Sequence, residues 1–203
     1  MPNYIPHAEK MNKKEIEHFY PETKEHWRKW LEKNHKEKDA VWVIHYKQNS
    51  GNPSIGWSDA VDEALCFGWI DSKGVAIDEI SFKQYYCKRK PISTWSKVNK
   101  EKIKQLVESN KMTDAGLACI EIAKQNGSWT ILDAVEELII PKDLAKEFKG
   151  NKESKAFFLS LSKSVKKSIL QWIVLAKRSE TRQKRIIEIV EMGQKNLKPK
   201  HLQ

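Results

Sequence analysis

Six side chains near the middle of the chain have the types and spacing of a binding site: Trp69, Asp71, Arg89, Ser93, Trp95 and Asn99. The guanidinium of Arg89, the hydroxyl of Ser93 and free backbone N–H groups at the start of a following helix together suit a carboxylate or a phosphate. Two indole rings would form the walls of such a cleft. The sequence therefore predicts a site here for a small or peptidic ligand.

The same residues also have a structural explanation. In it, Asp71 and Arg89 form an ion pair, Ser96 caps a helix, and both tryptophans lie in the core. We favour this explanation for the residues taken singly, because capping and ion pairing account for each of them. Ligand binding remains open beside it.

Covalent and metal chemistry have less support in the sequence. Cys66 is expected near the C-terminal end of a helix, where the helix dipole raises a thiol pKa, so we interpret it as a small core residue. No Cys or His pair has the spacing of metal ligands, and no glycine-rich loop has the pattern that binds ATP or a dinucleotide. We therefore expect no metal and no cofactor, and binding rather than catalysis.

The positive charge of the chain is concentrated in its last third. The net charge is +10, and residues 142–203 contain 16 Lys or Arg against 6 Asp or Glu, whereas residues 1–141 contain 21 of each kind. Such asymmetry predicts an anionic partner: nucleic acid, membrane head groups or an acidic protein. The densest cluster, and our candidate contact set, is Lys177, Arg178, Arg182, Lys184 and Arg185. A solvated basic surface without a partner is the alternative.

The N-terminal residues lack the pattern of a secretory signal, and no apolar run is long enough to span a bilayer. Three widely spaced cysteines fit reduced thiols better than a disulfide framework. We therefore expect a cytoplasmic protein without a transmembrane segment.

Three strands are predicted around the candidate residues. Residues 40–47 and 80–88 alternate β-favouring side chains, and Trp69 is expected to begin a strand directly after Gly68. Glycine suits the left-handed conformation that ends a helix, and Ser58 is expected to cap the helix that Gly68 ends. Together these strands predict a small antiparallel sheet.

Most of the remaining chain predicts helices. Helical periodicity covers residues 12–19, 22–36, 96–108 and 113–125, and nearly all of the chain after Pro141. The resulting fold class is α+β. We expect an α+β domain at residues 1–140, in which the sheet packs with helices, and a basic all-helical module at residues 141–203 packed on it.

Four blocks of sequence carry a wider resemblance. Residues 64–71 read Ala-Leu-Cys-Phe-Gly-Trp-Ile-Asp, and residues 89–99 fit Arg-x-Pro-x-Ser-x-Trp-Ser-x-x-Asn. Residues 112–116 fit Met-Thr-x-x-Gly, and residues 172–186 fit Trp-Ile-x-x-Ala-Lys-x-x-x-Thr-Arg-x-x-Arg-Ile. These blocks resemble the YdeI/OmpD-associated family, also called bacteriocin-protection proteins.

This resemblance implies stress protection or protection from bacteriocins and other antimicrobial peptides, with a link to an outer-membrane porin, but it implies no catalytic residues. We accordingly expect a cytoplasmic protein that acts by binding. Two alternatives stay open. One is an enzyme that acts on a small anionic substrate in the cleft of Trp, Asp and Arg, and the other is a nonspecific nucleic-acid-binding protein, whose affinity would fall steeply with salt.

Overall fold

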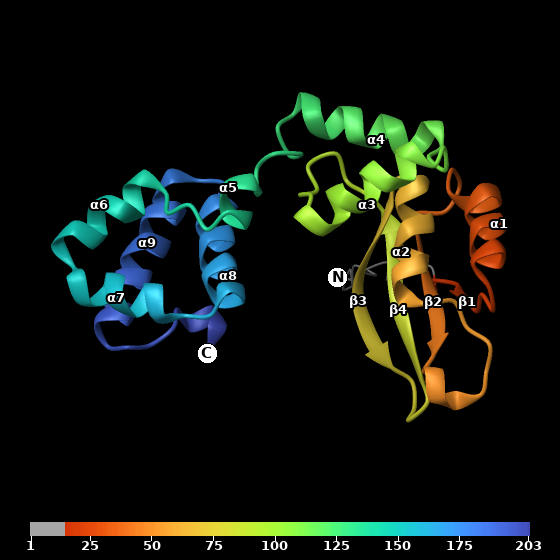
Figure 1. Cartoon of the computed structure of the whole chain (residues 1–203), viewed down its shortest axis with the longest axis horizontal. Coiled ribbons are helices and arrows are strands. Elements are labelled where there is room, and N and C mark those ends of the chain that lie inside the picture. The colour runs from red at the N-terminus through yellow and green to blue at the C-terminus, as the bar shows by residue number, and fades with distance from the viewer. Residues whose placement is uncertain (1–14) are drawn as a thin grey trace, which may run out of the picture. The chain divides into compact units, whose positions relative to one another are not determined.

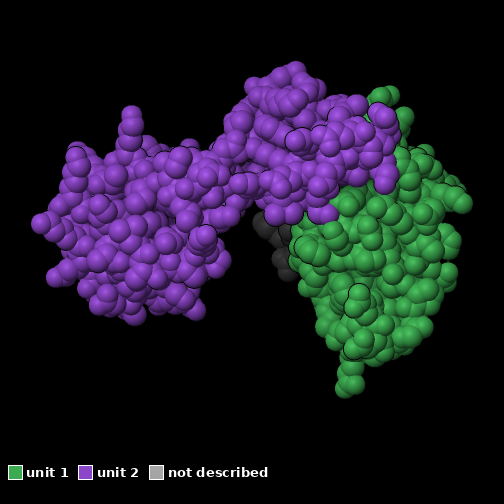
Figure 2. Space-filling view, in the orientation of Figure 1, with its two compact units in different colours: residues 1–89, 112–116 green, residues 90–111, 117–203 purple. Residues whose placement is uncertain are grey.

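The structure is a computed structural model that describes residues 15–203. The chain divides into two compact units (Figure 2), and each is described by itself. The first unit comprises Met1–Arg89 and Met112–Gly116, and the second comprises Lys90–Lys111 and Leu117–Gln203. These units differ from the predicted domains at residues 1–140 and 141–203, and that boundary remains a prediction.

A four-stranded sheet forms the centre of the first unit (Figure 1), in the order β1-β2-β4-β3. Its strands are β1 (His18–Phe19), β2 (Ala40–Tyr46), β3 (Trp69–Ala76) and β4 (Ser81–Lys88). The pairs β2–β4 and β3–β4 are antiparallel, as predicted, while the two-residue strand β1 adds to β2 in parallel. The predicted α+β fold class is confirmed, with a small sheet followed by a helical C-terminal stretch.

Two helices cover one face of this sheet, α1 (Lys24–Asn34) and α2 (Trp57–Cys66). The short 3-10 helix η1 (Gln48–Ser50) lies in the loop between β2 and α2. Thr23 caps α1, because its side-chain oxygen accepts a hydrogen bond from the backbone N–H of His26. The prediction that Ser58 caps α2 is wrong. Gly56 holds that position, and its carbonyl accepts the first helical hydrogen bond, from Ala60.

The prediction of a helix at residues 12–19 is also wrong for residues 15–19, which the structure describes. Residues 15–17 have no regular structure, His18 and Phe19 form β1, and residues 12–14 lie outside the described residues. The backbone carbonyl of Glu17 accepts a hydrogen bond from the N–H of Trp42 on β2, so pairing with the sheet edge replaces local helix formation.

Aromatic side chains from both layers build the core of the first unit. Trp27 of α1 packs edge-on against Tyr86 of β4, with ring centroids 5.4 Å apart, and Trp30 packs edge-on against Trp69 of β3 at 5.8 Å. The indole N–H of Trp27 also donates to the carbonyl of Ala60 at 3.0 Å, which ties α1 to α2. This burial of large rings fixes the two helices on the sheet.

The segment at residues 112–116 completes the first unit at the end of α2. Thr113 donates to the carbonyl of Cys66 twice, through its backbone N–H at 3.1 Å and its hydroxyl at 2.7 Å. Gly116 lies so close to the same carbonyl that a Cβ atom would overlap its oxygen. The Met-Thr-x-x-Gly block is therefore a clip on the last turn of α2, and Gly68 beyond it has a positive φ of 72°, as predicted.

The second unit is helical within the described chain. It contains α3 (Lys97–Glu108), most of α4 (Asp114–Gln125), the single-turn α5 (Asp133–Glu136), α6 (Lys142–Gly150), α7 (Lys152–Ser160), α8 (Lys163–Val174), α9 (Ser179–Gln194) and the 3-10 helix η2 (Lys200–Leu202). Its main core gathers apolar side chains from α5 to α9, among them Phe148, Phe158, Ile169, Ile173 and Ile186. None of the helices in the described chain is long and apolar enough to cross a membrane.

Candidate functional site

Asp71 is held on β3 by two neighbours from other elements. Its Oδ2 accepts a hydrogen bond from the indole N–H of Trp57, at the start of α2, and one from the amide of Gln84 on β4, each at 3.1 Å. The same Gln84 amide donates to the carbonyl of Ser72 at 3.3 Å. The pairing of β3 with β4 shifts register between Asp71 and Gly74, so the strand is irregular directly after this carboxylate.

The other two predicted residues of the first unit lie in its interior. Trp69 is 0% exposed and contacts Trp30, while Arg89 is 8% exposed and its backbone N–H donates to the carbonyl of Gly68. The indole of Trp69 is thus part of the core, as the structural explanation has it.

Ser93, Trp95 and Asn99 belong to the second unit. The hydroxyl of Ser93 accepts from the backbone N–H of Lys90, and Trp95 is 2% exposed against the ring of Trp129, with centroids 5.0 Å apart. The backbone N–H of Asn99 donates to the hydroxyl of Ser96, which confirms Ser96 as the cap of α3. The six predicted residues are therefore divided between the two units, and their binding of a ligand remains a prediction.

Sequence reasoning missed Trp57 and Gln84, the residues that the structure does bring to Asp71. Side-chain alternation along the strand places Gln84 on the same face as Tyr86, which is the register partner of Asp71. This alternation was a usable signal for Gln84. No pattern in the sequence indicated that Trp57 contacts Asp71, because the predicted cap at Ser58 placed Trp57 outside the helix.

Cys66 is a buried thiol beside charged side chains, and its environment disfavours the thiolate. It is 0% exposed, and burial raises the pKa of its thiol to about 11, with the negative charge of Glu63 adding to the effect. The fraction of reactive thiolate at neutral pH is accordingly very small.

Among residues 15–203, no group of His, Cys, Asp and Glu side chains is arranged to hold a metal ion.

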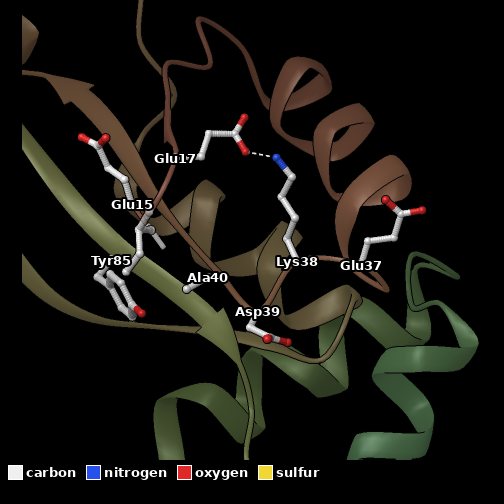
Figure 3. A pocket seen from close by; sticks show the side chains of 8 residues that line it. Glu15, Glu17, Glu37, Lys38, Asp39, Ala40 and Tyr85 are labelled. Carbon is white, nitrogen blue, oxygen red and sulfur yellow. Dashed lines mark hydrogen bonds and ion pairs between the residues drawn. The ribbon is translucent and has the colours of Figure 1, made fainter. Parts of the chain in front are cut away.

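A pocket of about 390 Å³ lies where the start of β2 meets the residues before β1 (Figure 3). Carboxylates dominate its lining, which consists of Glu15, Ile16, Glu17, Glu37, Lys38, Asp39, Ala40 and Tyr85. Burial alone would raise the pKa of Glu17, but hydrogen bonds from Lys38 and Trp30 outweigh it and lower that pKa. Lys38 and Glu17 form an ion pair, and the other charged side chains of the lining are the carboxylates of Glu15, Glu37 and Asp39.

A second hollow of about 590 Å³ continues from this pocket over the face of the sheet opposite to α1 and α2. It shares Glu15, Ile16 and Tyr85 with the first, and adds His18, Trp42, Ser72 and Lys73. The rings of Trp42 and Tyr85 meet edge-on at 5.1 Å, and the ammonium of Lys83 lies 4.9 Å from the centre of the Trp42 ring. Acidic and aromatic lining thus adjoin on one surface.

The predicted basic cluster divides into exposed and structural residues. Arg182 donates to both carboxylate oxygens of Asp143 and to the carbonyl of Ile173, at the end of α8. Arg185 donates to the carbonyl of Trp172 and stacks over its ring at 5.0 Å. Lys177, Arg178 and Lys184 are exposed, so these three are the members most available to an anionic partner.

We expect the pair of Arg182 and Asp143 to make the stability of the helical part depend on pH. The hydrogen bond from Arg182 is the main cause that lowers the pKa of Asp143. A lowered carboxyl pKa stabilises the fold above the unfolded-state value of about 4, and this contribution is lost as the pH falls through the lower folded-state value. We expect Arg182→Gln to be less stable than the wild type by about 1 kcal/mol at pH 7, since both side chains are partly exposed.

Urea unfolding at neutral and acid pH checks this expectation. The difference between wild type and Arg182→Gln should shrink as the pH falls below about 4. An equal difference at neutral and strongly acid pH would mean that Arg182 acts through packing and not through the charge of Asp143.

Family comparisons bear on both parts of the chain. Residues 137–196 match the family described as "Bacteriocin-protection, YdeI or OmpD-Associated", and residues 19–119 match a domain of unknown function, DUF8412. No curated protein and no solved structure matches the chain. The block at residues 172–186 lies inside the first match, so the resemblance noted in the sequence is confirmed there. Over residues 137–196, the chain is therefore similar to the YdeI/OmpD-associated family.

Proposed function

We propose that this chain is a stress-protection protein that acts by binding, and that its first unit captures a cationic peptide of the antimicrobial or bacteriocin type. The observation that carries the proposal is the joined acidic and aromatic surface around β1. Glu15 and Glu37 at the acidic pocket form no ion pair with any described residue, whereas Asp39 pairs with Lys88. Antimicrobial peptides combine basic and apolar side chains, and this surface offers a complement to each.

Binding is favoured over catalysis because the chemistry of the described residues is committed elsewhere. The thiol of Cys66 is buried and protonated, and Trp69 and Trp95 are buried. An enzyme acting on a small anionic substrate would need an open site, and the acidic pocket disfavours an anion. The three free cysteines support a reducing compartment, so we place the protein in the cytoplasm.

Calorimetric titration with a synthetic peptide of lysine and leucine tests the proposal. Glu15→Gln/Glu37→Gln should bind about fivefold more weakly, because exposed charge pairs each contribute a few tenths to 1 kcal/mol. Glu180→Gln/Glu191→Gln removes the same charge from exposed positions of α9 and should bind like the wild type. If both double variants bound the peptide equally weakly, the loss of affinity would come from net charge and not from the acidic pocket. If the wild type did not bind the peptide, the proposal would be rejected.

The helical part suggests a second function, contact with a polyanion. Acidic side chains are fewer than basic ones there, 6 against 16 in residues 142–203. Three acidic side chains of the unit are engaged within it: Asp143 with Arg182, Glu136 with Lys167, and Glu188 with the backbone N–H of Lys200. The exposed basic residues of α6 to α9 therefore face solvent with little acid to balance them. Such a surface attracts phosphate groups of nucleic acid or lipid.

Binding to random duplex DNA at several salt concentrations tests this second function. We expect the affinity of the wild type to fall steeply with salt, and Lys177→Gln/Arg178→Gln/Lys184→Gln to reduce the logarithmic slope by about 3, one for each phosphate contact. Lys29→Gln/Lys33→Gln/Lys36→Gln, in the first unit, is the matched control and should keep the slope. An unchanged slope in the first variant would exclude this cluster, and binding to anionic vesicles alone would identify a membrane surface instead.

A further inference from the structure

Trp57 is an exposed tryptophan held in a fixed orientation. It is 54% exposed, while Trp27, Trp69 and Trp95 are at most 2% exposed. Its indole N–H is fixed by the hydrogen bond to Asp71, so one large ring presents its apolar surface to solvent in a defined position. An exposed ring of this size that is anchored from below is typical of a recognition surface.

The carboxylate of Asp71, which anchors this ring, accepts hydrogen bonds through one of its two oxygens. Both of its hydrogen bonds, from Trp57 and from Gln84, end on Oδ2, and within the described chain Oδ1 accepts none. Asp71 forms no ion pair with any residue from 15 to 203, although it is half-buried on β3. A half-buried negative charge without a cation is costly, and a cation from outside would offset that cost.

The surrounding sheet keeps this carboxylate in place. Gln84 is 8% exposed and its amide is packed against Gly74, where a Cβ atom would lie 2.7 Å from the Gln84 Oε1. Gly74 therefore leaves the space that the amide needs to reach Asp71. Tyr86, the register partner of Asp71, is fully buried, and its hydroxyl has no hydrogen-bond partner in the described chain. Its pKa is raised, first by burial and then by the charge of Asp71.

We propose that Trp57 and Asp71 form a recognition site for a guanidinium group, such as the side chain of arginine. A guanidinium is planar and weakly hydrated, so it stacks on the indole while one N–H donates to Asp71 Oδ1. β3 is the edge strand of the sheet beside this site (Figure 1), and among described residues it pairs with β4 alone. Neither Trp57 nor Asp71 lines the acidic pocket of Figure 3. The two sites can therefore be tested with different substitutions.

An NMR titration of the full chain tests the proposal. The indole N–H signal of Trp57, assigned by its loss in Trp57→Phe, is followed while N-acetyl-arginine-amide is added. We expect a saturable shift with a Kd on the order of 1 mM, typical of a single small contact. Asp71→Asn should weaken binding about tenfold, and Trp57→Phe about threefold, because phenylalanine retains part of the cation–π attraction.

Two controls decide what the shift means. Asp59→Asn removes an exposed carboxylate two residues from Trp57, one that pairs with Lys24, and it should leave the affinity unchanged. N-acetyl-lysine-amide should bind clearly more weakly than the arginine compound, and equal affinity would overturn the guanidinium assignment. No saturable shift of the Trp57 signal, or equal loss in Asp59→Asn and Asp71→Asn, would overturn the site itself.

One further comparison distinguishes an arginine in a peptide from a free small molecule as the source of the guanidinium. A short peptide with a central arginine, added to the same protein, should bind severalfold more tightly than the amino-acid derivative if an extended chain also contacts β3. Equal affinity would show that the ligand is a free small molecule and would overturn a peptide source. Retained arginine binding in Glu15→Gln/Glu37→Gln would support the independence of this site from the proposed peptide pocket.

Discussion

Replacing Gly116 by alanine should lower the free energy of unfolding of the first unit by about 3 kcal/mol. The added Cβ would overlap the carbonyl oxygen of Cys66 and would lie 2.8 Å from its carbonyl carbon and 2.7 Å from the Cε of Met112. Met112 is flexible and can move, but the carbonyl is backbone at the end of α2. The substitution must therefore displace the clip and weaken both hydrogen bonds from Thr113 to Cys66.

Urea unfolding followed by tryptophan fluorescence measures this effect, because five of the eight tryptophans lie in the first unit. Gly150→Ala is the matched control. Nothing lies within 4 Å of a Cβ built at Gly150, so this substitution should change stability by less than about 1 kcal/mol, in the stabilising direction. Equal stability of the Gly116 variant and the wild type would mean that residues 112–116 do not sit on Cys66.

Replacing Arg28 by methionine should destabilise the first unit by a similar amount, about 3 kcal/mol. The guanidinium of Arg28 lies 2.7 Å from the carboxylate of Glu63, whose side chain is only 3% exposed. Removing the arginine leaves that buried charge with Lys24 as its remaining partner, at 3.8 Å. A long contact of this kind replaces only part of the interaction that is lost.

The double variant Arg28→Met/Glu63→Met separates the lost pair from lost packing. We expect it to recover much of the stability, because two apolar side chains leave no charge to bury. Lys104→Met serves as the control for an exposed pair, since Lys104 and Glu108 are both largely exposed and 4.0 Å apart, and it should cost less than about 0.5 kcal/mol. No recovery in the double variant would show that Arg28 acts mainly through its contact with Phe67.

The sequence predicted the parts of the fold that depend on local patterns. The strand at residues 40–47 corresponds to β2, the cap at Ser96 begins α3, and the left-handed Gly68 separates α2 from β3. Each of these is decided by neighbours within a few residues. The parallel strand β1 escaped prediction because it forms by pairing with residues of β2 more than twenty positions away.

The candidate site was only partly predictable for the same reason. Asp71 stood out by its place after Gly68 and Trp69, but its actual neighbours come from α2 and β4, and only the register of β3 with β4 brings them close. The pocket of Figure 3 combines residues before β1, the start of β2 and one residue of β4, which no linear motif joins. Arg182 and Arg185 were predicted from charge alone, and charge did not reveal that carbonyls at the end of α8 engage them.

The clip at residues 112–116 has a consequence for how the protein emerges from the ribosome. The first unit is not a continuous stretch of chain, because residues 90–111 belong to the second unit and separate Arg89 from Met112. Synthesis proceeds from the N-terminus, so the sheet and α2 are exposed for some time before Thr113 can reach the carbonyl of Cys66. The last turn of α2 thus stays open to solvent or to a chaperone until the polypeptide has grown well beyond the sheet.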